Sequence, residues 1–233
     1  MIDIHLHCLP NVDDGSSCLE NSIKLIKDES EMGVTDVICT CHYRLDMERF
    51  LTPIDKLKEV FLQLQRSAKE QNIPVNLHLW QEVHHDDEMQ KLVKDGKVLT
   101  INDSKFMLLE LDFCYAPSDL LKVIDDYKSF GKLPIIAHYE RYAFATIEGA
   151  RALKEKGVLI QVNAYSLFAE EGVERRDFAF KLLDEKLVDF IASDMHDYRS
   201  SNRFLSAYEL VKEKYGEEYA NDLFINNARE ILK

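Results

Sequence analysis

Apolar and polar residues alternate strictly at the start of the chain and then change to a helical spacing. Residues 2–7 alternate so that Asp3, His5 and His7 share one face, which predicts a strand. Apolar residues then recur every three or four positions over residues 19–32, which predicts a helix. The chain therefore opens with a strand followed by a helix.

The same order of strand and helix recurs along the chain. Apolar and β-branched runs predict further strands at residues 34–40, 75–82, 106–111, 133–138, 158–163 and 188–194. Helical spacing predicts helices from about residue 53 and at residues 120–130, 147–156, 178–185, 205–215 and 217–232. Alternating elements favour a parallel sheet, and seven strands in this length favour a closed barrel. We predict one α/β domain, residues 1–233, built as a seven-stranded (β/α)7 TIM-like barrel.

An open doubly wound sheet is the alternative architecture. Its usual glycine-rich phosphate turn is absent after the first strand, where residues 5–10 read His-Leu-His-Cys-Leu-Pro. The barrel is therefore the better prediction.

Composition and charge narrow the range of partners. The 233 residues are 46% hydrophobic and 30% charged, which suits a folded domain with a sizeable core. With 29 basic and 42 acidic residues the net charge is −13, which disfavours broad binding to nucleic acid or an anionic membrane. No stretch approaches the roughly 18 apolar residues of a membrane span, and the start lacks the pattern of a signal peptide. We expect a cytoplasmic protein that does not insert into membranes.

The five cysteines argue against both a disulfide framework and thiol catalysis. Their odd number and unpaired spacing fit a reducing compartment, and Cys39 and Cys41 are expected to be packing residues. A cysteine-based phosphatase loop needs an arginine six positions after its cysteine, and none of the five has one.

Residues able to bind a metal ion stand at the carboxyl side of nearly every predicted strand. They are His5, His7, His42, Glu82, Glu110, His138, Asp194 and His196. In a β/α barrel these strand ends converge on the face where active sites are built. The set is too large for one tetrahedral zinc and predicts two or three divalent ions. Imidazole and carboxylate ligands without thiolate suit manganese, iron or zinc.

Taken alone, each part of this pattern also has a plainer explanation. Residues 13–15, Asp-Asp-Gly, suit a simple turn, and a single His-x-His pair is not specific for metal. Arg141 or a lysine could neutralise buried carboxylates instead of a cation. His84 and His85 stand beside acidic residues and are interpreted as a solvated loop, and His78 as a structural residue.

Arginines near the same strand ends point to phosphate. A guanidinium group matches phosphate bidentately, and the relevant residues are Arg44, Arg141, Arg199 and Arg203. A cluster of divalent ions supplies hydroxide at neutral pH and stabilises in-line phosphoryl displacement. Hydrolysis of a phosphoester is the predicted chemistry, with salt bridges or plain solvation of these arginines as the alternative.

Several motifs together resemble one family. Residues 3–7 (Asp-Ile-His-Leu-His), 12–15 (Val-Asp-Asp-Gly), 137–142 (Ala-His-Tyr-Glu-Arg-Tyr) and 192–197 (Ala-Ser-Asp-Met-His-Asp) resemble the polymerase and histidinol phosphatase superfamily. Within it the chain is similar to the bacterial metal-dependent protein tyrosine phosphatases of capsule and exopolysaccharide operons. The likeness extends to residues 162–167 and 223–229, so it covers almost the whole chain.

The resemblance implies a distorted seven-stranded barrel with three metal ions, most often manganese. It places one ion on His5, His7, Glu110 and Asp194, a second on Glu82, Glu110 and His138, and a third on Asp14, His42 and His196. Glu110 would bridge two ions, and Arg141 matches a phosphate contact. The implied substrate is a phosphotyrosine-bearing protein, namely the tyrosine-rich tail of a cytosolic kinase that governs polysaccharide export.

Three positions depart from the family pattern and bear on substrate preference. Arg203 would replace the arginine of an Arg-Pro-Pro motif without the prolines, Gln81 stands where glycine is common, and Arg44 belongs to a less basic pair after His42. The alternatives are a phosphatase for histidinol phosphate or another small metabolite, and a non-catalytic metal-bound interaction module. An amidohydrolase is disfavoured because strand four ends in Glu110 rather than in a bridging lysine.

Overall fold

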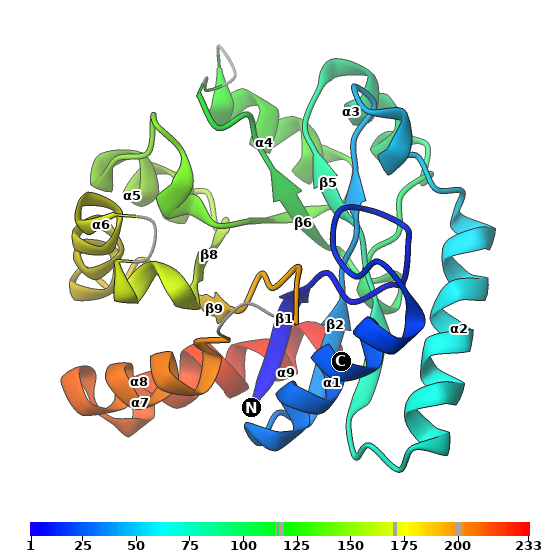
Figure 1. The fold of residues 1–233 in the computed structure, drawn as a ribbon. Coiled ribbons are helices and arrows are strands. Elements are labelled where there is room, and N and C mark those ends of the chain that lie inside the picture. Colours follow the sequence, from blue (N-terminus) through cyan, green and yellow to red (C-terminus); the bar gives the residue numbers. More distant parts are fainter. Residues whose placement is uncertain (115, 117–118, 170–171, 199–201) are drawn as a thin grey trace.

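The computed structural model of the chain describes residues 1–114, 116, 119–169, 172–198 and 202–233. The strands lie at the centre of the molecule and the helices surround them (Figure 1). The strands are β1 (Ile2–Leu6), β2 (Asp36–Cys39), β3 (His42–Tyr43), β4 (Asn76–Leu79), β5 (Glu82–His84), β6 (Phe106–Glu110), β7 (Leu133–Ile136), β8 (Leu159–Asn163) and β9 (Phe190–Ala192). The longer helices are α1 (Leu19–Glu31), α2 (Ile54–Glu70), α3 (Asp87–Lys94), α4 (Leu120–Ser129), α5 (Ile147–Glu155), α6 (Val173–Asp184) and α7 (Phe204–Tyr215).

Short helical segments complete the chain. Five residues of π-helix, η5 (Asp222–Asn226), join α8 (Glu217–Asn221) to α9 (Asn227–Leu232) near the C-terminus. The 3-10 segments η1 (Glu48–Phe50), η3 (Tyr139–Arg141) and η4 (Ala164–Phe168) each follow a strand, whereas η2 (Ile101–Asp103) lies between α3 and β6. No helix among the described residues combines the length and the apolar character needed to span a membrane.

Neighbouring strands are parallel in every pairing that the described residues make. One sheet has the order β1-β2-β4 and the other the order β3-β5-β6-β7-β8-β9. The segment that follows β9 runs beside β1, because the His7 N–H donates to the Met195 carbonyl at 3.0 Å and the Asp194 N–H to the His5 carbonyl at 2.8 Å. The fold is therefore a single α/β domain with a curled parallel sheet.

The predicted count of seven strands is not confirmed, since the described residues form nine strand segments. The predicted strand at residues 34–40 corresponds to β2, and the short β3 follows it after a break at residues 40–41. The predicted strand at residues 75–82 is interrupted at residues 80–81. Backbone pairing nevertheless continues beside both interruptions, because the Trp80 N–H donates to the Cys39 carbonyl at 3.1 Å and the Glu82 N–H to the Cys41 carbonyl at 2.8 Å.

The core lies on both sides of the sheet. Ile4, Ile38 and Trp80 are buried in the cluster on one side. Leu64 and Ala68 of α2 belong to the larger cluster that joins the helices to the sheet. Every residue of β1 is buried. The alternation of polar and apolar residues at positions 2–7 therefore does not distinguish a solvent-exposed face from a buried one.

Most predicted helices are confirmed to within a few residues, but α3 was not predicted. Its N-terminus is capped by the Asp86 side chain, which accepts hydrogen bonds from the Glu88 and Met89 N–H groups. The interpretation of His84 and His85 as a solvated loop was wrong. His84 belongs to β5 and is buried, and the His85 ring lies 2.9 Å from the Tyr127 hydroxyl.

Candidate metal centre

The candidate ligands gather at the carboxyl edge of the curled sheet. His5 lies in β1, Glu110 ends β6, and His138 lies two residues after the end of β7. His42 and Glu82 begin β3 and β5, which continue the direction of β2 and β4. Pairing of parallel strands brings these ends together, as the sequence predicts.

Three groups of ligand atoms lie close enough to hold ions. In each group the candidate ligand atoms all lie within 4.8 Å of one another. The groups are His7, Asp14, His42 and His196; His5, His7 and Asp194; and His42, Glu82 and Glu110. His138 joins the cluster through Nε2, which lies 2.9 Å from Oε1 of Glu82. All nine residues proposed from the sequence are therefore in one place.

Glu82 occupies the middle of this cluster. Its Oε2 lies 2.8 Å from Nδ1 of His42 and 3.4 Å from Nε2 of both His5 and His7. Glu110 lies further from the other candidate ligands, with a carboxylate oxygen 3.8 Å from Nδ1 of His42 and another 3.9 Å from Nε2 of His138. The geometry therefore makes Glu82 as good a bridging candidate as Glu110.

The donor set fits divalent cations. Oε2 of Glu82 and Nδ1 of His42 are buried and close, yet neither makes a hydrogen bond among the described residues. Nε2 of His5 faces Nε2 of His7 at 3.0 Å, so two nitrogen lone pairs converge unless one carries a proton. Buried polar atoms normally find partners, and cations of the imidazole and carboxylate type would satisfy all of these.

The charges of the cluster strongly perturb its titration. Burial, followed by the charge of Glu82, raises the pKa of Glu110 to about 8. Burial, followed by the nearby His7, lowers the pKa of His196 to about 4. Although burial disfavours the charged form of His5, the carboxylates of Glu82 and Asp194 raise its pKa to about 9. Such opposed shifts are typical of functional sites.

Special backbone geometry places three of these side chains. His138 has φ 33° and ψ 53°, and Asp194 has φ 51°, so both lie in the left-handed region that non-glycine residues rarely adopt. A Cβ atom at Gly15 would lie 2.4 Å from the His7 carbonyl oxygen, so only glycine allows the turn carrying Asp14 to approach β1.

A second layer of polar side chains orients the ligands, and the sequence analysis missed it. Oε1 of Gln161 lies 3.2 Å from Nδ1 of His5 and accepts the His138 N–H at 2.9 Å. Asn163 donates from Nδ2 to Oδ2 of Asp194 at 2.7 Å. Both belong to β8, where polar residues alternate with Ile and Val, and that alternation was the available signal.

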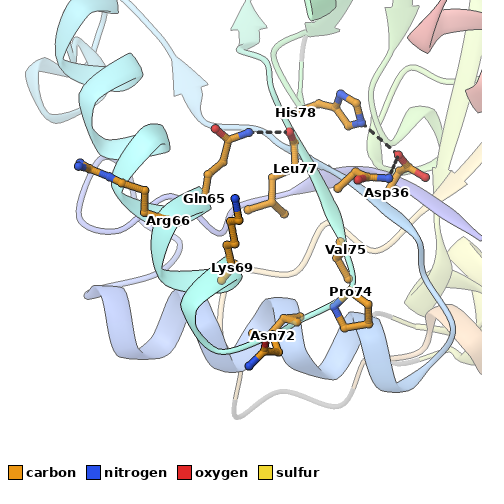
Figure 2. Close-up of a pocket in the computed structure, with 12 residues that line it drawn as sticks. Asp36, Gln65, Arg66, Lys69, Asn72, Pro74, Val75, Leu77 and His78 are labelled. Carbon is orange, nitrogen blue, oxygen red and sulfur yellow. Dashed lines mark hydrogen bonds and ion pairs between the residues drawn. The ribbon is translucent and has the colours of Figure 1, made fainter.

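A cavity of about 370 Å³ opens over the cluster. His42, Glu110, His138, Asp194 and His196 are among its lining residues. A larger groove of about 930 Å³ lies between α2 and β4, where Gln65 donates to the Leu77 carbonyl and His78 pairs with Asp36 (Figure 2). That groove is lined by none of the nine candidate ligands, so the smaller cavity is the candidate active site.

Comparison with known proteins shows the family to which this chain belongs. A family model described as capsular polysaccharide synthesis, CpsB/CapC, matches residues 1–233. The tyrosine-protein phosphatase CpsB of Streptococcus pneumoniae is 33% identical over 241 residues, covering 100% of this chain and 98% of that protein. The chain belongs to the CpsB/CapC family.

Further CpsB/CapC relatives agree with this placement. The tyrosine-protein phosphatase YwqE of Bacillus subtilis is 28% identical over 236 residues, covering 100% of this chain and 92% of that protein. A crystal structure from work on YwqE and CpsB, described as unique metal-dependent tyrosine phosphatases, has a TM-score of 0.91 and 27% identity, covering 100% of this chain and 94% of that chain. The resemblance stated from the motifs is confirmed.

Two of the predicted arginines reach the cavity of this CpsB/CapC member. Nη1 of Arg44 lies 3.4 Å from Oε2 of Glu110, and Nη1 of Arg141 lies 3.2 Å from Oδ2 of Asp194. Arg203 is not among the lining residues and places its guanidinium 5.4 Å from the centre of the Phe168 ring. Arg199 falls outside the described residues.

Arg49 lines the same cavity of the CpsB/CapC fold and was missed. Its Nη2 lies 3.7 Å from Oδ2 of Asp14, and its guanidinium lies 4.4 Å from the Phe50 ring centre. Arginines near the ends of predicted strands were considered as phosphate ligands. Arg49 lies several residues beyond the short strand β3, so that criterion did not select it.

Proposed function

We propose that the chain is a metal-dependent protein tyrosine phosphatase. The observation that carries this proposal is the convergence of candidate metal ligands and of Arg44 and Arg141 on one cavity, in a chain of the CpsB/CapC family. The curated relatives CpsB and YwqE are named tyrosine-protein phosphatases, which supports the same reading. Convergence of this kind suits hydrolysis of a phosphomonoester.

The proposed cofactors are two or three divalent ions, with manganese favoured and iron or zinc as alternatives. Their proposed ligands are His5, His7, Asp14, His42, Glu82, Glu110, His138, Asp194 and His196. When bound, such ions supply hydroxide at neutral pH and neutralise charge on the phosphoryl group.

The side chains of the protein have separate tasks in this proposal. Arg141 and Arg44 bind the phosphoryl oxygens, because guanidinium groups remain charged and match phosphate. Both arginines rest against carboxylates of the cluster, which directs them toward the cavity. The leaving phenolate of tyrosine has a pKa near ~10, so its departure needs little help from a general acid.

The proposed substrate is a phosphotyrosine-bearing protein, in particular the C-terminal tail of a bacterial tyrosine kinase of capsule or exopolysaccharide synthesis. The family description, which refers to capsular polysaccharide synthesis, supports this choice. We propose a cytoplasmic location, which the free state of the described cysteines supports.

We further propose that residues 1–233 form one catalytic domain and that its sheet is a distorted seven-stranded barrel. In that barrel β2 with β3, and β4 with β5, each count as one interrupted strand. The hydrogen bonds that continue beside the interruptions support this count, and so does the contact of β9 with β1.

The test is hydrolysis of a phosphotyrosine peptide, the matching phosphoserine peptide and histidinol phosphate by chelator-stripped protein, with and without manganese. We expect manganese-dependent release mainly from phosphotyrosine. Release mainly from histidinol phosphate would place the protein among the metabolic phosphatases. No release from any of them with metal bound would indicate an interaction module.

A further inference from the structure

Apolar side chains border the polar cavity of the candidate metal centre. Met47, Phe50 and Phe113 all line it, and we call them the apolar rim. Met47 is 39% exposed, and Phe113 is half-buried. They come from separate loops, Met47 and Phe50 after β3 and Phe113 after β6. A single exposed apolar residue needs no explanation, but apolar groups from two loops around a charged cavity are typical of a ligand site.

The ring of Phe113 is held in place beside the candidate ligands. It stacks on His138 with the ring centres 5.4 Å apart and the planes inclined by 29°. Its carbonyl accepts the Ala143 N–H at 2.8 Å, which holds the backbone of Phe113 in place. The guanidinium of Arg141 lies 4.8 Å from the ring centre. An apolar surface therefore stands directly beside a group that suits phosphate binding.

The other loop repeats this arrangement. Phe50 lies 5.0 Å from the His42 ring, centre to centre, and the Arg49 guanidinium covers Phe50 at 4.4 Å. Phe50 is buried, so Met47 is the apolar side chain of this loop that a ligand can reach. Methionine adapts its shape to aromatic groups and makes favourable sulfur–ring contacts.

We propose that Met47 and Phe113 select aryl over alkyl phosphomonoesters by contacting the aromatic ring of the substrate. The inference rests on the proposed function and deepens it. A phosphoryl group held by Arg141 places its ester substituent at the apolar rim. A phenyl ring there buries apolar surface against Met47 and Phe113, whereas the single methylene of a phosphoserine side chain offers little surface to bury.

The test separates ring recognition from phosphate recognition through two non-hydrolysable ligands, phenylphosphonate and methylphosphonate. Calorimetric titration of the full-length, manganese-loaded protein measures both affinities. We expect wild-type protein to prefer phenylphosphonate. We expect Met47→Ala and Phe113→Ala each to weaken phenylphosphonate binding by about tenfold, the size expected for loss of one ring contact, with methylphosphonate unchanged.

Leu62→Ala is the matched control, because Leu62 is also exposed but lies on α2 and does not line the cavity. We expect it to leave both affinities unchanged. Phe113→Leu should restore part of the preference, since it keeps apolar bulk. Phe113 contacts His138, so Phe113→Ala could also lower the manganese content. In that case the result for Met47→Ala decides whether the rim selects aryl groups, because Met47 is not a candidate metal ligand.

The outcomes distinguish this inference from the proposed function. Equal binding of the two phosphonates by wild-type protein that hydrolyses phosphotyrosine would overturn the inference and keep the function. Equal weakening of both phosphonates in the Met47 variant would also overturn it. A clear preference for phenylphosphonate in a protein that hydrolyses no phosphotyrosine would support the rim and contradict the function.

Discussion

Nδ1 of His7 lies 2.7 Å from Oδ2 of Asp13, and this contact determines which nitrogen of His7 faces the candidate metal centre. The same carboxylate oxygen accepts the His42 N–H at 3.1 Å, so one buried side chain orients two candidate ligands. Although burial opposes ionisation, the neighbouring His7 lowers the pKa of Asp13 to about 2. Carboxylates in this position fix the tautomer of a ligating histidine and increase its basicity.

Asp13→Asn should therefore weaken metal binding without unfolding the protein. Asparagine keeps the size of the side chain but loses the charge that supports His7. We expect manganese affinity to fall by about 10- to 100-fold, as for other second-layer partners, measured by competition with a fluorescent chelator. Asp125→Asn is the control, because Asp125 pairs only with Lys156 at the surface among the contacts described for it. Unchanged affinity in Asp13→Asn would contradict the assigned role.

Glu82 and Glu110 can be separated by matched glutamine substitutions. Glu110→Gln should lose metal and activity while circular dichroism and the unfolding transition show a folded protein. Glu82→Gln should lose at least as much metal, because Glu82 stands closest to His42 and His138. Metal content by mass spectrometry is the measurement. Full occupancy and turnover in Glu110→Gln would rule out bridging by that residue.

Two of the arginines expected from the sequence to bind phosphate, Arg141 and Arg203, should differ in their effect on activity. Arg141→Ala should lower kcat/KM for a phosphotyrosine peptide by about 100-fold or more, in line with loss of a charged contact in the transition state. Arg203→Ala should change it by less than about threefold, because Arg203 does not line the cavity. Steady-state kinetics at fixed manganese measures both. A comparable loss in both variants would place Arg203 back at the site.

The buried Glu29 gives stability a pH dependence. Oε1 of Glu29 accepts a hydrogen bond from Asn202 at 2.5 Å, while Oε2 is buried without a hydrogen bond among the described residues. Burial, followed by the charge of Asp3, holds the pKa of Glu29 well above its usual range. The folded state therefore binds this proton more tightly than the unfolded state. The stabilisation is complete below the unfolded pKa and is lost as pH rises through the folded pKa.

Glu29→Gln should remove this loss. The amide oxygen can still accept from Asn202, so the free energy of unfolding should rise at pH 8 by on the order of 1 kcal/mol or more and change little at pH 4.5. Urea denaturation of chelated protein at the two pH values measures the effect. Glu31→Gln, an exposed change on the same helix, is the control. An equal effect at both pH values would count against a raised pKa.

The sequence predicts the ligands well because their positions follow from strand ends. Local apolar patterns show where each strand ends, and so where Glu110 and His138 lie. The parallel order of the strands then brings those ends together. Gln161 contacts His5, which is far away along the chain, and Asp13 contacts His7 across an irregular turn, so only the folded structure reveals either contact. The role of Arg203 stays a prediction, because a loop residue has no periodicity to fix the direction of its side chain.

The strand interruptions and α3 were missed for different reasons. The apolar run at residues 75–82 does not show where regular strand geometry stops, since backbone pairing continues beside the break. The sequence does carry the capping residue Asp86, but four charged residues at positions 86–88 and 91 hide the short apolar face formed by Met89 and Val93.

The left-handed backbone conformation of His138 and Asp194 creates a trade-off between stability and function. Each such residue costs on the order of 1 kcal/mol that the rest of the fold must offset. Glycine at either position would relax the backbone and, in the same step, delete a candidate ligand. A directed-evolution experiment that selects for thermal stability alone would therefore enrich variants that are more stable but inactive. A useful screen must also select for metal binding.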